Sequence, residues 1–158
     1  MNGLPRVVLD CVVFLQGAGR RTGPSRRCLE LVRDGAVLLC LSPPVVDEIR
    51  DVLGRTALAL KFPDLNSNTS IELIDSLLLT GVLFDPVPKF ITLPRDPKDE
   101  IYLDLAAVAD ADYLVTWNER HLTYLMTAAE PEALEFRARL PKLRIIDPPT
   151  LLSMLKTP

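Results

Sequence analysis

The chain has 158 residues, of which 48% are hydrophobic and 25% charged, and its formal net charge is -3 at pH 7. A chain of this length can bury its own hydrophobic core, and this composition argues against disorder and against a membrane protein. No stretch approaches the roughly 18 consecutive apolar residues of a membrane-spanning helix, and residues 1–10 lack the pattern of a signal peptide. We therefore expect a single domain over residues 1–158, located in the cytoplasm and without membrane contact.

The first half of the chain alternates short apolar runs with amphipathic segments, a pattern typical of strands followed by helices. Ser42 is a suitable N-cap, because proline occupies the first turn of the helix that follows it. In chain order we predict a strand over residues 6–10, a helix beginning near residue 11, a loop over 17–23, a helix from Pro24 that stops at Gly35, a strand over 37–41, and helices over 43–53, 54–61 and 67–79.

The second half continues the alternation after a proline-rich interruption. Pro86, Pro88 and Pro94 keep this connection extended up to the motif Asp96-Pro97-Lys98-Asp99, which is typical of a helix start. In chain order we predict a strand over residues 82–87, a helix over 99–109, a strand over 113–116, a helix over 132–140, a strand over 143–146 and a terminal helix over 150–155.

This alternation indicates an α/β fold with a central parallel sheet. The strands are nearly continuous runs of Val, Ile and Leu, so we expect helices on both faces of a sheet of 4–5 strands, in three α/β/α layers. Sheets of this kind bind ligands beyond the carboxyl ends of their strands, where the loops converge and helix N-termini point.

Three carboxylates are predicted to meet at that edge. Asp10 closes the first strand, Glu48 lies in the helix after the second strand, and Asp99 begins the helix before the fourth. Neighbouring carboxylates repel each other and raise each other's pKa, so their gathering is favourable when a cation lies among them. Oxygen ligands suit Mg²⁺ or Mn²⁺, whereas one histidine and scattered cysteines do not suit zinc.

Each acid also has a structural interpretation. Asp96 is best explained as an N-cap. Asp99 in the first turn could simply stabilise the helix through a favourable interaction with the helix dipole. Glu48 could be a solvated helix residue, as Asp47 and Asp51 beside it are expected to be. Asp10 is harder to explain in this way, because a charge that ends an apolar central strand needs a partner.

The charge of the chain is unevenly distributed. Residues 1–61 hold nine Arg or Lys and six Asp or Glu, a balance of +3, whereas residues 62–158 hold nine and fifteen, a balance of -6. The basic half includes a cluster in the glycine-rich loop and the helix after it, where the side chains could contact nucleic-acid phosphates. The alternative is a solvated charged loop. The cluster consists of Arg20, Arg21, Arg26 and Arg27.

Four segments together resemble a PIN-domain protein in their order and spacing. They are Val8-Leu9-Asp10, the segment from Ser42 to Glu48, Asp96-Pro97-Lys98-Asp99, and the segment from Ala111 to Asn118. The chain is most similar to the stand-alone bacterial or archaeal PIN proteins that form the toxin of a toxin-antitoxin pair.

The resemblance implies a Mg²⁺- or Mn²⁺-dependent endoribonuclease. The positions that match Asp10, Glu48 and Asp99 would ligate the metal, directly or through water. Thr116 and Asn118 match the polar pair that helps to position metal, water or the scissile phosphate. The resemblance also implies an RNA substrate, a small antitoxin protein as partner, and a homodimer.

Two positions depart from the family pattern. Val12 stands where the family usually has Asn or Ser, and Asn118 stands where Asp is frequent. These departures motivate an alternative from another class, a PIN scaffold with impaired catalysis that binds RNA or a partner. A phosphatase with Asp10 as nucleophile is disfavoured, because Val12 replaces its second Asp. We expect Glu119 to be exposed, and His121 to begin the next helix in a surface or capping role.

Overall fold

Five short strands form one parallel sheet in a computed structural model that describes residues 3–53, 55 and 68–156. The strand order across the sheet is β3-β2-β1-β4-β5. All four neighbouring pairs are parallel, which confirms the predicted sheet. The strands are β1 (Arg6–Leu9), β2 (Leu38–Leu41), β3 (Val82–Leu83), β4 (Tyr113–Val115) and β5 (Arg144–Ile146).

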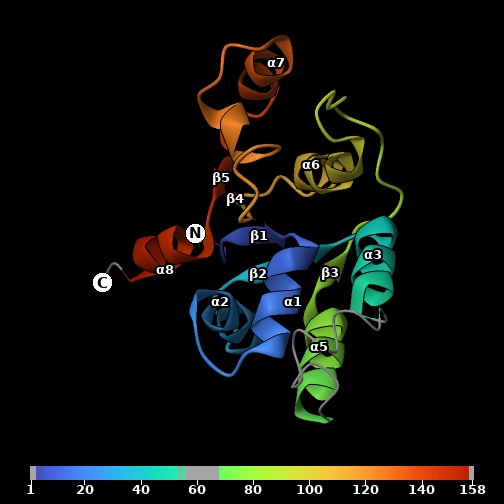
Figure 1. Ribbon diagram of the computed structural model, residues 1–158, viewed down its shortest axis with the longest axis vertical. Coiled ribbons are helices and arrows are strands. Elements are labelled where there is room, and N and C mark those ends of the chain that lie inside the picture. Colours follow the sequence, from blue (N-terminus) through green and yellow to red (C-terminus); the bar gives the residue numbers. More distant parts are fainter. Residues whose placement is uncertain (1–2, 54, 56–67, 157–158) are drawn as a thin grey trace.

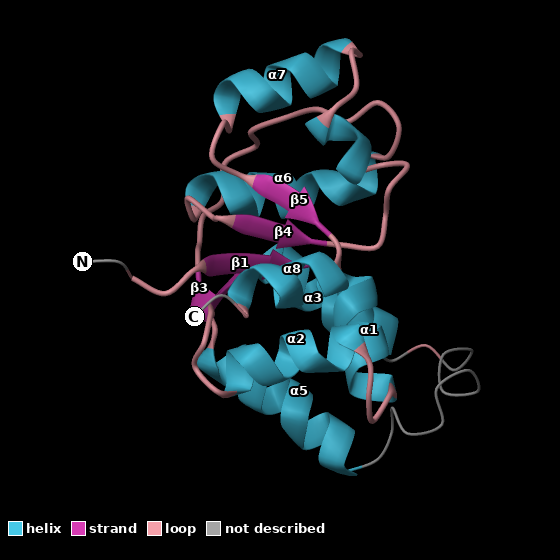
Figure 2. Cartoon of the chain, turned by 90° about the vertical axis from the view of Figure 1, so that its left-hand side faces the viewer, coloured by secondary structure: helices cyan, strands magenta, loops and turns pink. Residues whose placement is uncertain are grey.

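Helices cover both faces of this sheet, so the predicted three-layer α/β/α arrangement is confirmed. Figures 1 and 2 show α1, α2 and α5 gathered on one side of the strands and α6 and α7 on the other. The helices are α1 (Cys11–Gly19), α2 (Pro24–Arg33), α3 (Pro43–Leu53), α5 (Asn68–Thr80), α6 (Glu100–Val108), α7 (Pro131–Arg139) and α8 (Pro148–Leu155). Two 3₁₀ turns, η2 (Pro97–Asp99) and η3 (Thr123–Met126), join them.

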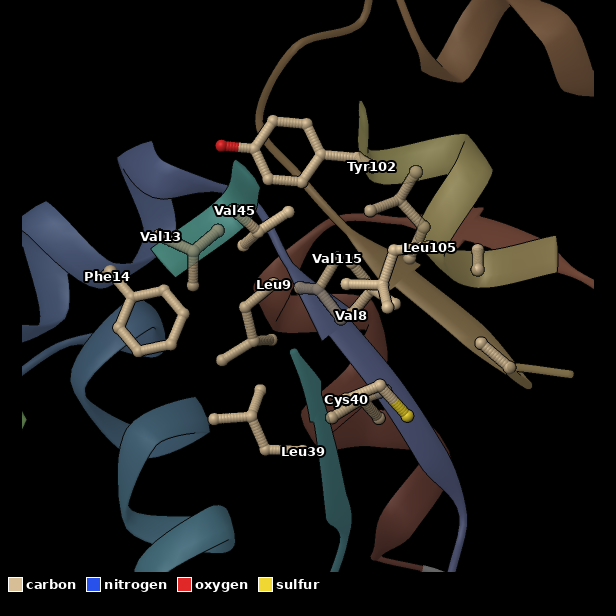
Figure 3. Close-up of a cluster of buried hydrophobic side chains, with 14 of the residues drawn as sticks. Val8, Leu9, Val13, Phe14, Leu39, Cys40, Val45, Tyr102, Leu105 and Val115 are labelled. Carbon is tan, nitrogen blue, oxygen red and sulfur yellow. The ribbon is translucent and has the colours of Figure 1, made fainter. Parts of the chain in front are cut away.

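The core is built from the aliphatic strands and the helix faces that cover them. Val7, Val8 and Leu9 of β1 are each at most 1% exposed, as expected for a central strand buried on both faces. Figure 3 shows side chains of β1 and β4 between Val13 and Phe14 of α1 and Tyr102 and Leu105 of α6. This packing holds the carboxyl ends of β1 and β4 in fixed positions.

The strand order creates a switch point between β1 and β4. From β1 the chain proceeds to one edge through β2 and β3, then returns to the other side of β1 to form β4 and β5. Loops leave β1 and β4 in opposite directions at such a point, and a crevice opens beyond their carboxyl ends. The register pairs Leu9 with Val115, so Asp10 and Thr116 enter this crevice side by side.

Polar residues at strand ends cap the helices that follow. The Oδ1 atom of Asp10 accepts from the backbone N–H of Val13 at 3.0 Å, and the Ser42 hydroxyl accepts from Val45 at 3.3 Å. Asp147 accepts from the backbone N–H of Thr150 at 2.9 Å. An N-cap accepts a hydrogen bond from a backbone N–H at the start of a helix that has no partner within the helix. An acidic residue after a strand can therefore mark the start of a helix as well as a functional site.

Two predicted boundaries were wrong. Helix α1 continues to Gly19, so the loop predicted over residues 17–23 begins only at Arg20. The reason is that Gly17 is buried against α2, which extends the helix contact. Strand β3 ends at Leu83 instead of residue 87, because Pro86 and Pro88 cannot donate to a sheet ladder.

Two further predictions concern helices. His121 does not begin a helix but lies in a turn, since the carbonyl of Asn118 accepts from the backbone N–H groups of Leu122 and Thr123. The helix predicted over residues 54–61 lies outside the described residues. Within the part of the chain that the structure describes, no helix is both long enough and apolar enough to cross a membrane.

Candidate metal centre

Asp10 lies at the carboxyl end of β1 with both carboxylate oxygens engaged. Oδ1 accepts from the backbone N–H of Val13, and Oδ2 accepts from the hydroxyl of Thr116. The side chain is 5% exposed, and this burial raises the pKa of Asp10 to about 6 against the opposing effect of these hydrogen bonds. The site therefore orients the Asp10 carboxylate but leaves its negative charge poorly compensated.

Glu48 lies in α3, on the side that faces α1 and α6. Its Oε2 atom accepts from the hydroxyl of Tyr102 at 2.6 Å, and its Oε1 atom accepts from the thiol of Cys11 at 3.8 Å. The Tyr102 hydroxyl in turn accepts from the backbone N–H of Cys11 at 3.1 Å. Glu48 is half-buried in these contacts, so the interpretation as a solvated helix residue is wrong.

Tyr102 was missed by sequence reasoning. It reaches from α6 toward α1 and α3, as Figure 3 shows, and it is 1% exposed. Burial, together with Cys11 and Glu48, raises the pKa of Tyr102, so its hydroxyl stays protonated and acts as a donor. A tyrosine three residues after Asp99 fits helical spacing toward the core, and this spacing was the signal that could have identified it.

Asp99 precedes α6 but does not cap it through its side chain. Its Oδ2 atom accepts instead from the side-chain amide of Asn118 at 3.0 Å. Burial raises the pKa of Asp99 to about 6, and repulsion from Asp96, Asp10 and Glu48 adds to this rise while His121 lowers it. The charges of Asp10 and Glu48 thus act on Asp99, and Asp10 and Asp99 line one cavity. Among the described residues, however, neither Asp10 nor Glu48 belongs to a group of three ligand atoms that lie within 4.8 Å of one another.

Thr116 and Asn118 connect the carboxylates to β4. The Thr116 hydroxyl donates to Asp10 and accepts from the backbone N–H of Asn118 at 2.9 Å. The Oδ1 atom of Asn118 accepts from the backbone N–H of His121 at 3.1 Å, which turns its amide nitrogen toward Asp99. An aspartate at position 118 would face Asp99 with another negative charge, whereas this asparagine donates a hydrogen bond.

A second acidic group shares Asp99. Side-chain ligand atoms of Asp96, Asp99 and His121 all lie within 4.8 Å of one another, and sequence reasoning did not predict this group. Asp96 is confirmed as an N-cap, since it accepts from the backbone N–H of Lys98 at 3.1 Å. It also lies 3.2 Å from Nδ1 of His121. Asp96 thus has a histidine as ion-pair partner, whereas the hydrogen-bond partners of Asp10, Val13 and Thr116, are uncharged.

Asp10 and Glu48 have no cationic partner among the described residues, whereas Asp99 lies close to His121. Among the described residues, no ion pair involves Asp10, Glu48 or Asp99. These acids offer oxygen donors, which suit a hard divalent cation, and His121 beside Asp99 is a basic group near them. Burial raises the pKa of Cys11 to about 12, so its thiol stays protonated and is a poor metal ligand at neutral pH.

A cavity of about 240 Å³ opens at this site. It is lined by Asp10, Cys11, Val12, Asp99, Tyr102, Trp117 and Asn118. A larger cavity of about 500 Å³ lies at the amino ends of the strands and includes Asp110, Asp112 and Lys142. Lys142 pairs there with Asp110 at 3.0 Å and Asp112 at 3.5 Å, so those carboxylates already have a positive partner.

The four arginines of the basic cluster differ in their surroundings. Arg20 and Arg21 are exposed in the connection between α1 and α2, and Arg27 is exposed on α2. Arg26 is half-buried and donates to the backbone carbonyl of Gly17 at 3.2 Å, so it helps to hold α2 against α1. Glu119, as predicted, is exposed.

Comparison with known proteins agrees with this arrangement. The family model of the PIN domain matches residues 6–120, which includes β1 to β4 and the segments that carry the three acids. A search of curated proteins finds no match. The match covers most of the chain, and the observed parallel sheet is that of a PIN-like fold. The chain therefore belongs to the PIN-domain family, whose members are generally metal-dependent nucleases.

Proposed function

We propose that this protein is a divalent-metal-dependent endoribonuclease that hydrolyses phosphodiester bonds in RNA. The observation that carries the proposal is the buried Asp10 carboxylate, which has no cationic partner among the described residues, lines one cavity with Asp99, and is close enough to Glu48 for their charges to interact. These three acids would hold Mg²⁺ or Mn²⁺ at the switch point of the sheet. PIN nucleases act on RNA, so the substrate class follows from the family.

The side chains of the site can perform the steps that hydrolysis requires. A bound metal would act as a Lewis acid that stabilises negative charge on the phosphate and lowers the pKa of water. Burial raises the pKa values of Asp10 and Asp99 to about 6 without metal, and a bound divalent cation would lower them, so both carboxylates would be ionised when they hold the metal. Thr116 and Asn118 keep these two carboxylates in place through their hydrogen bonds.

The charge distribution supports a nucleic-acid substrate. Arg20, Arg21 and Arg27 are exposed around the junction of α1 and α2. The N-terminal turn of α2 contacts the cavity wall, because the hydroxyl of Ser25 accepts from the indole N–H of Trp117 at 3.0 Å. Guanidinium groups in this place could bind phosphates on either side of the cleavage point.

The direct test is cleavage of an unstructured RNA by the purified protein. We expect cleavage with Mn²⁺ or Mg²⁺, its loss on chelation, and a loss of about 10²-fold or more in Asp10→Asn. Glu72→Gln removes an exposed carboxylate of α5 and should retain activity. Activity that survives both chelation and Asp10→Asn would rule the mechanism out.

A second candidate function is a catalytically impaired PIN scaffold that binds RNA or a partner protein. Its motivation is Val12, which lines the cavity, is 41% exposed and offers no polar group there. Calorimetric titration separates the two functions. RNA binding without Mn²⁺ binding at millimolar concentration would favour the scaffold. The toxin role, the antitoxin partner and the homodimer, which the resemblance implies, stay predictions.

A further inference from the structure

Trp117 is the single tryptophan of the chain, and it lies at the wall of the candidate site. Its side chain is 37% exposed, and it lines the same cavity as Asp10, Asp99 and Asn118. It lies between Thr116 and Asn118 in the segment after β4, so the segment that carries the polar pair also carries the indole. A large aromatic surface left open beside a polar site is a candidate contact for a ligand.

The indole is held in a fixed orientation. Its N–H donates to the hydroxyl of Ser25 at 3.0 Å, and that hydroxyl donates to the side-chain carbonyl of Gln16 at 3.1 Å. Ser25 is 4% exposed, so the anchor is buried between α1 and α2. With its N–H satisfied inside the protein, Trp117 offers a ligand its ring surface and not a hydrogen bond. A ring fixed before binding loses little conformational freedom on contact.

We propose that Trp117 is a stacking platform for an unpaired base next to the phosphate that the carboxylates process. The substrate class would then be single-stranded RNA, or RNA with an unpaired loop. This inference rests on the proposed function, since it takes RNA as the substrate. Proteins bind single-stranded RNA by stacking its unpaired bases on aromatic side chains, whereas the bases of an RNA duplex are already stacked on each other.

The surroundings of Trp117 favour RNA over a protein partner. Tryptophan is also frequent in protein interfaces, where it fills an apolar pocket. Here the ring is bordered by Asp10, Asp99 and Asn118 on one side and anchored on the other to α2, which carries the exposed Arg27. A base on the indole would have its backbone phosphates between a cation site and basic side chains, which matches the alternation of base and phosphate in RNA.

The single tryptophan allows a direct measurement in the whole protein. With a chelator present to prevent cleavage, an unstructured homopolymeric oligoribonucleotide is titrated while the Trp117 fluorescence is recorded. We expect saturable quenching that parallels binding followed by anisotropy of labelled RNA. An RNA duplex of the same length should bind through its phosphates without comparable quenching. Equal quenching by both forms, or by neither, overturns the proposal.

Variants test whether stacking contributes to affinity. Trp117→Ala should weaken single-strand binding by about tenfold to a hundredfold, and Trp117→Phe should retain most of the affinity because it keeps a ring. Leu134→Ala removes another exposed apolar side chain, on α7, and should bind as the wild type does. Circular dichroism confirms that each variant is folded. Wild-type affinity in Trp117→Ala overturns the proposal.

Failure of this inference can be separated from failure of the proposed function. Quenching in chelator, without cleavage in Mn²⁺, would refute the nuclease but support the platform. Cleavage in Mn²⁺ without any effect of Trp117→Ala on affinity for single-stranded RNA would support the nuclease and overturn the platform.

Discussion

Tyr102 is the side chain through which α6 contacts Glu48. Its hydroxyl donates to Glu48 and accepts from the backbone N–H of Cys11, so one oxygen joins three helices. Glu48 depends on this contact for its orientation, because among the described residues its other hydrogen-bond partner is the thiol of Cys11, which is a weak donor. Tyr102 is therefore a positioning residue for a proposed metal ligand, not a catalytic residue.

Removal of the Tyr102 hydroxyl should weaken metal binding. Partners that hold a ligand in place typically contribute about 10- to 100-fold to metal affinity, so we expect a loss of this size in Tyr102→Phe. Isothermal titration with Mn²⁺ measures it without reference to cleavage. Tyr124→Phe is the matched control, because it removes a tyrosine hydroxyl that contacts Glu132 at 3.2 Å, away from the cavity. Equal Mn²⁺ affinity in both variants would contradict the positioning role.

At the scale of elements, the contact between α1 and α2 supports the site. A Cβ atom on Gly17 would lie 2.6 Å from Cδ1 of Leu29 and 2.9 Å from the backbone carbonyl oxygen of Ser25. The side chain of Leu29 could adjust, but the backbone of α2 could not move without displacing the hydroxyl that anchors Trp117. Glycine at position 17 thus allows the close approach on which the orientation of the indole depends.

We expect Gly17→Ala to destabilise the fold and to disturb Trp117. Overpacking of a tight helix contact costs about 1–3 kcal/mol in the free energy of unfolding, which denaturant titration measures. Tryptophan fluorescence should shift at the same time, because Ser25 moves with α2. Gly3→Ala is the control, since a Cβ atom there meets nothing within 4 Å. A Gly17→Ala protein with wild-type stability and emission would disprove this role of the contact.

At the scale of the whole molecule, the parallel sheet gathers uncompensated carboxylates at one edge. Burial raises the pKa of Asp10, and likewise that of Asp99, from the ordinary 3.8 to about 6. The folded protein therefore binds more protons than the unfolded chain between these two values. Because of this difference, the contribution of these groups to the free energy of unfolding falls as the pH rises through that window.

This relation predicts how pH and metal act on stability. We compare the free energy of unfolding of the wild type with that of Asp10→Asn in the presence of a chelator. As the pH rises from 4 to above 6, the wild type should lose on the order of 2–3 kcal/mol of this free energy relative to the variant. The other acidic residues contribute the same pH dependence to both proteins, so their contribution cancels in this comparison. Above pH 6, saturating Mn²⁺ should stabilise the wild type and not the variant.

Denaturant titrations at a series of pH values, with chelator and with Mn²⁺, provide the measurement. Parallel curves for the two proteins in chelator would show that Asp10 carries no buried charge. A similar response of both proteins to Mn²⁺ would place the ion elsewhere, for example at Asp96 and His121.

The amino-acid sequence by itself determined the fold class and part of the site. The alternation of aliphatic runs with amphipathic segments predicted the parallel sheet and its covering helices. Asp10, Asp96 and Ser42 were predictable at their positions, because strand ends and helix caps depend on residues only a few positions apart. The predicted boundaries were wrong at the ends of α1 and β3, where helix packing and the missing N–H groups of Pro86 and Pro88 set the limits.

The tertiary structure alone decided which distant side chains meet. Glu48 and Tyr102 are 54 positions apart, and Trp117 and Ser25 are 92 apart, yet each pair shares a hydrogen bond. Such pairs follow from the strand order and from the packing of helices on the sheet, which no periodicity of the sequence encodes. The orientation of Glu48 and the fixed indole are therefore properties of the folded chain.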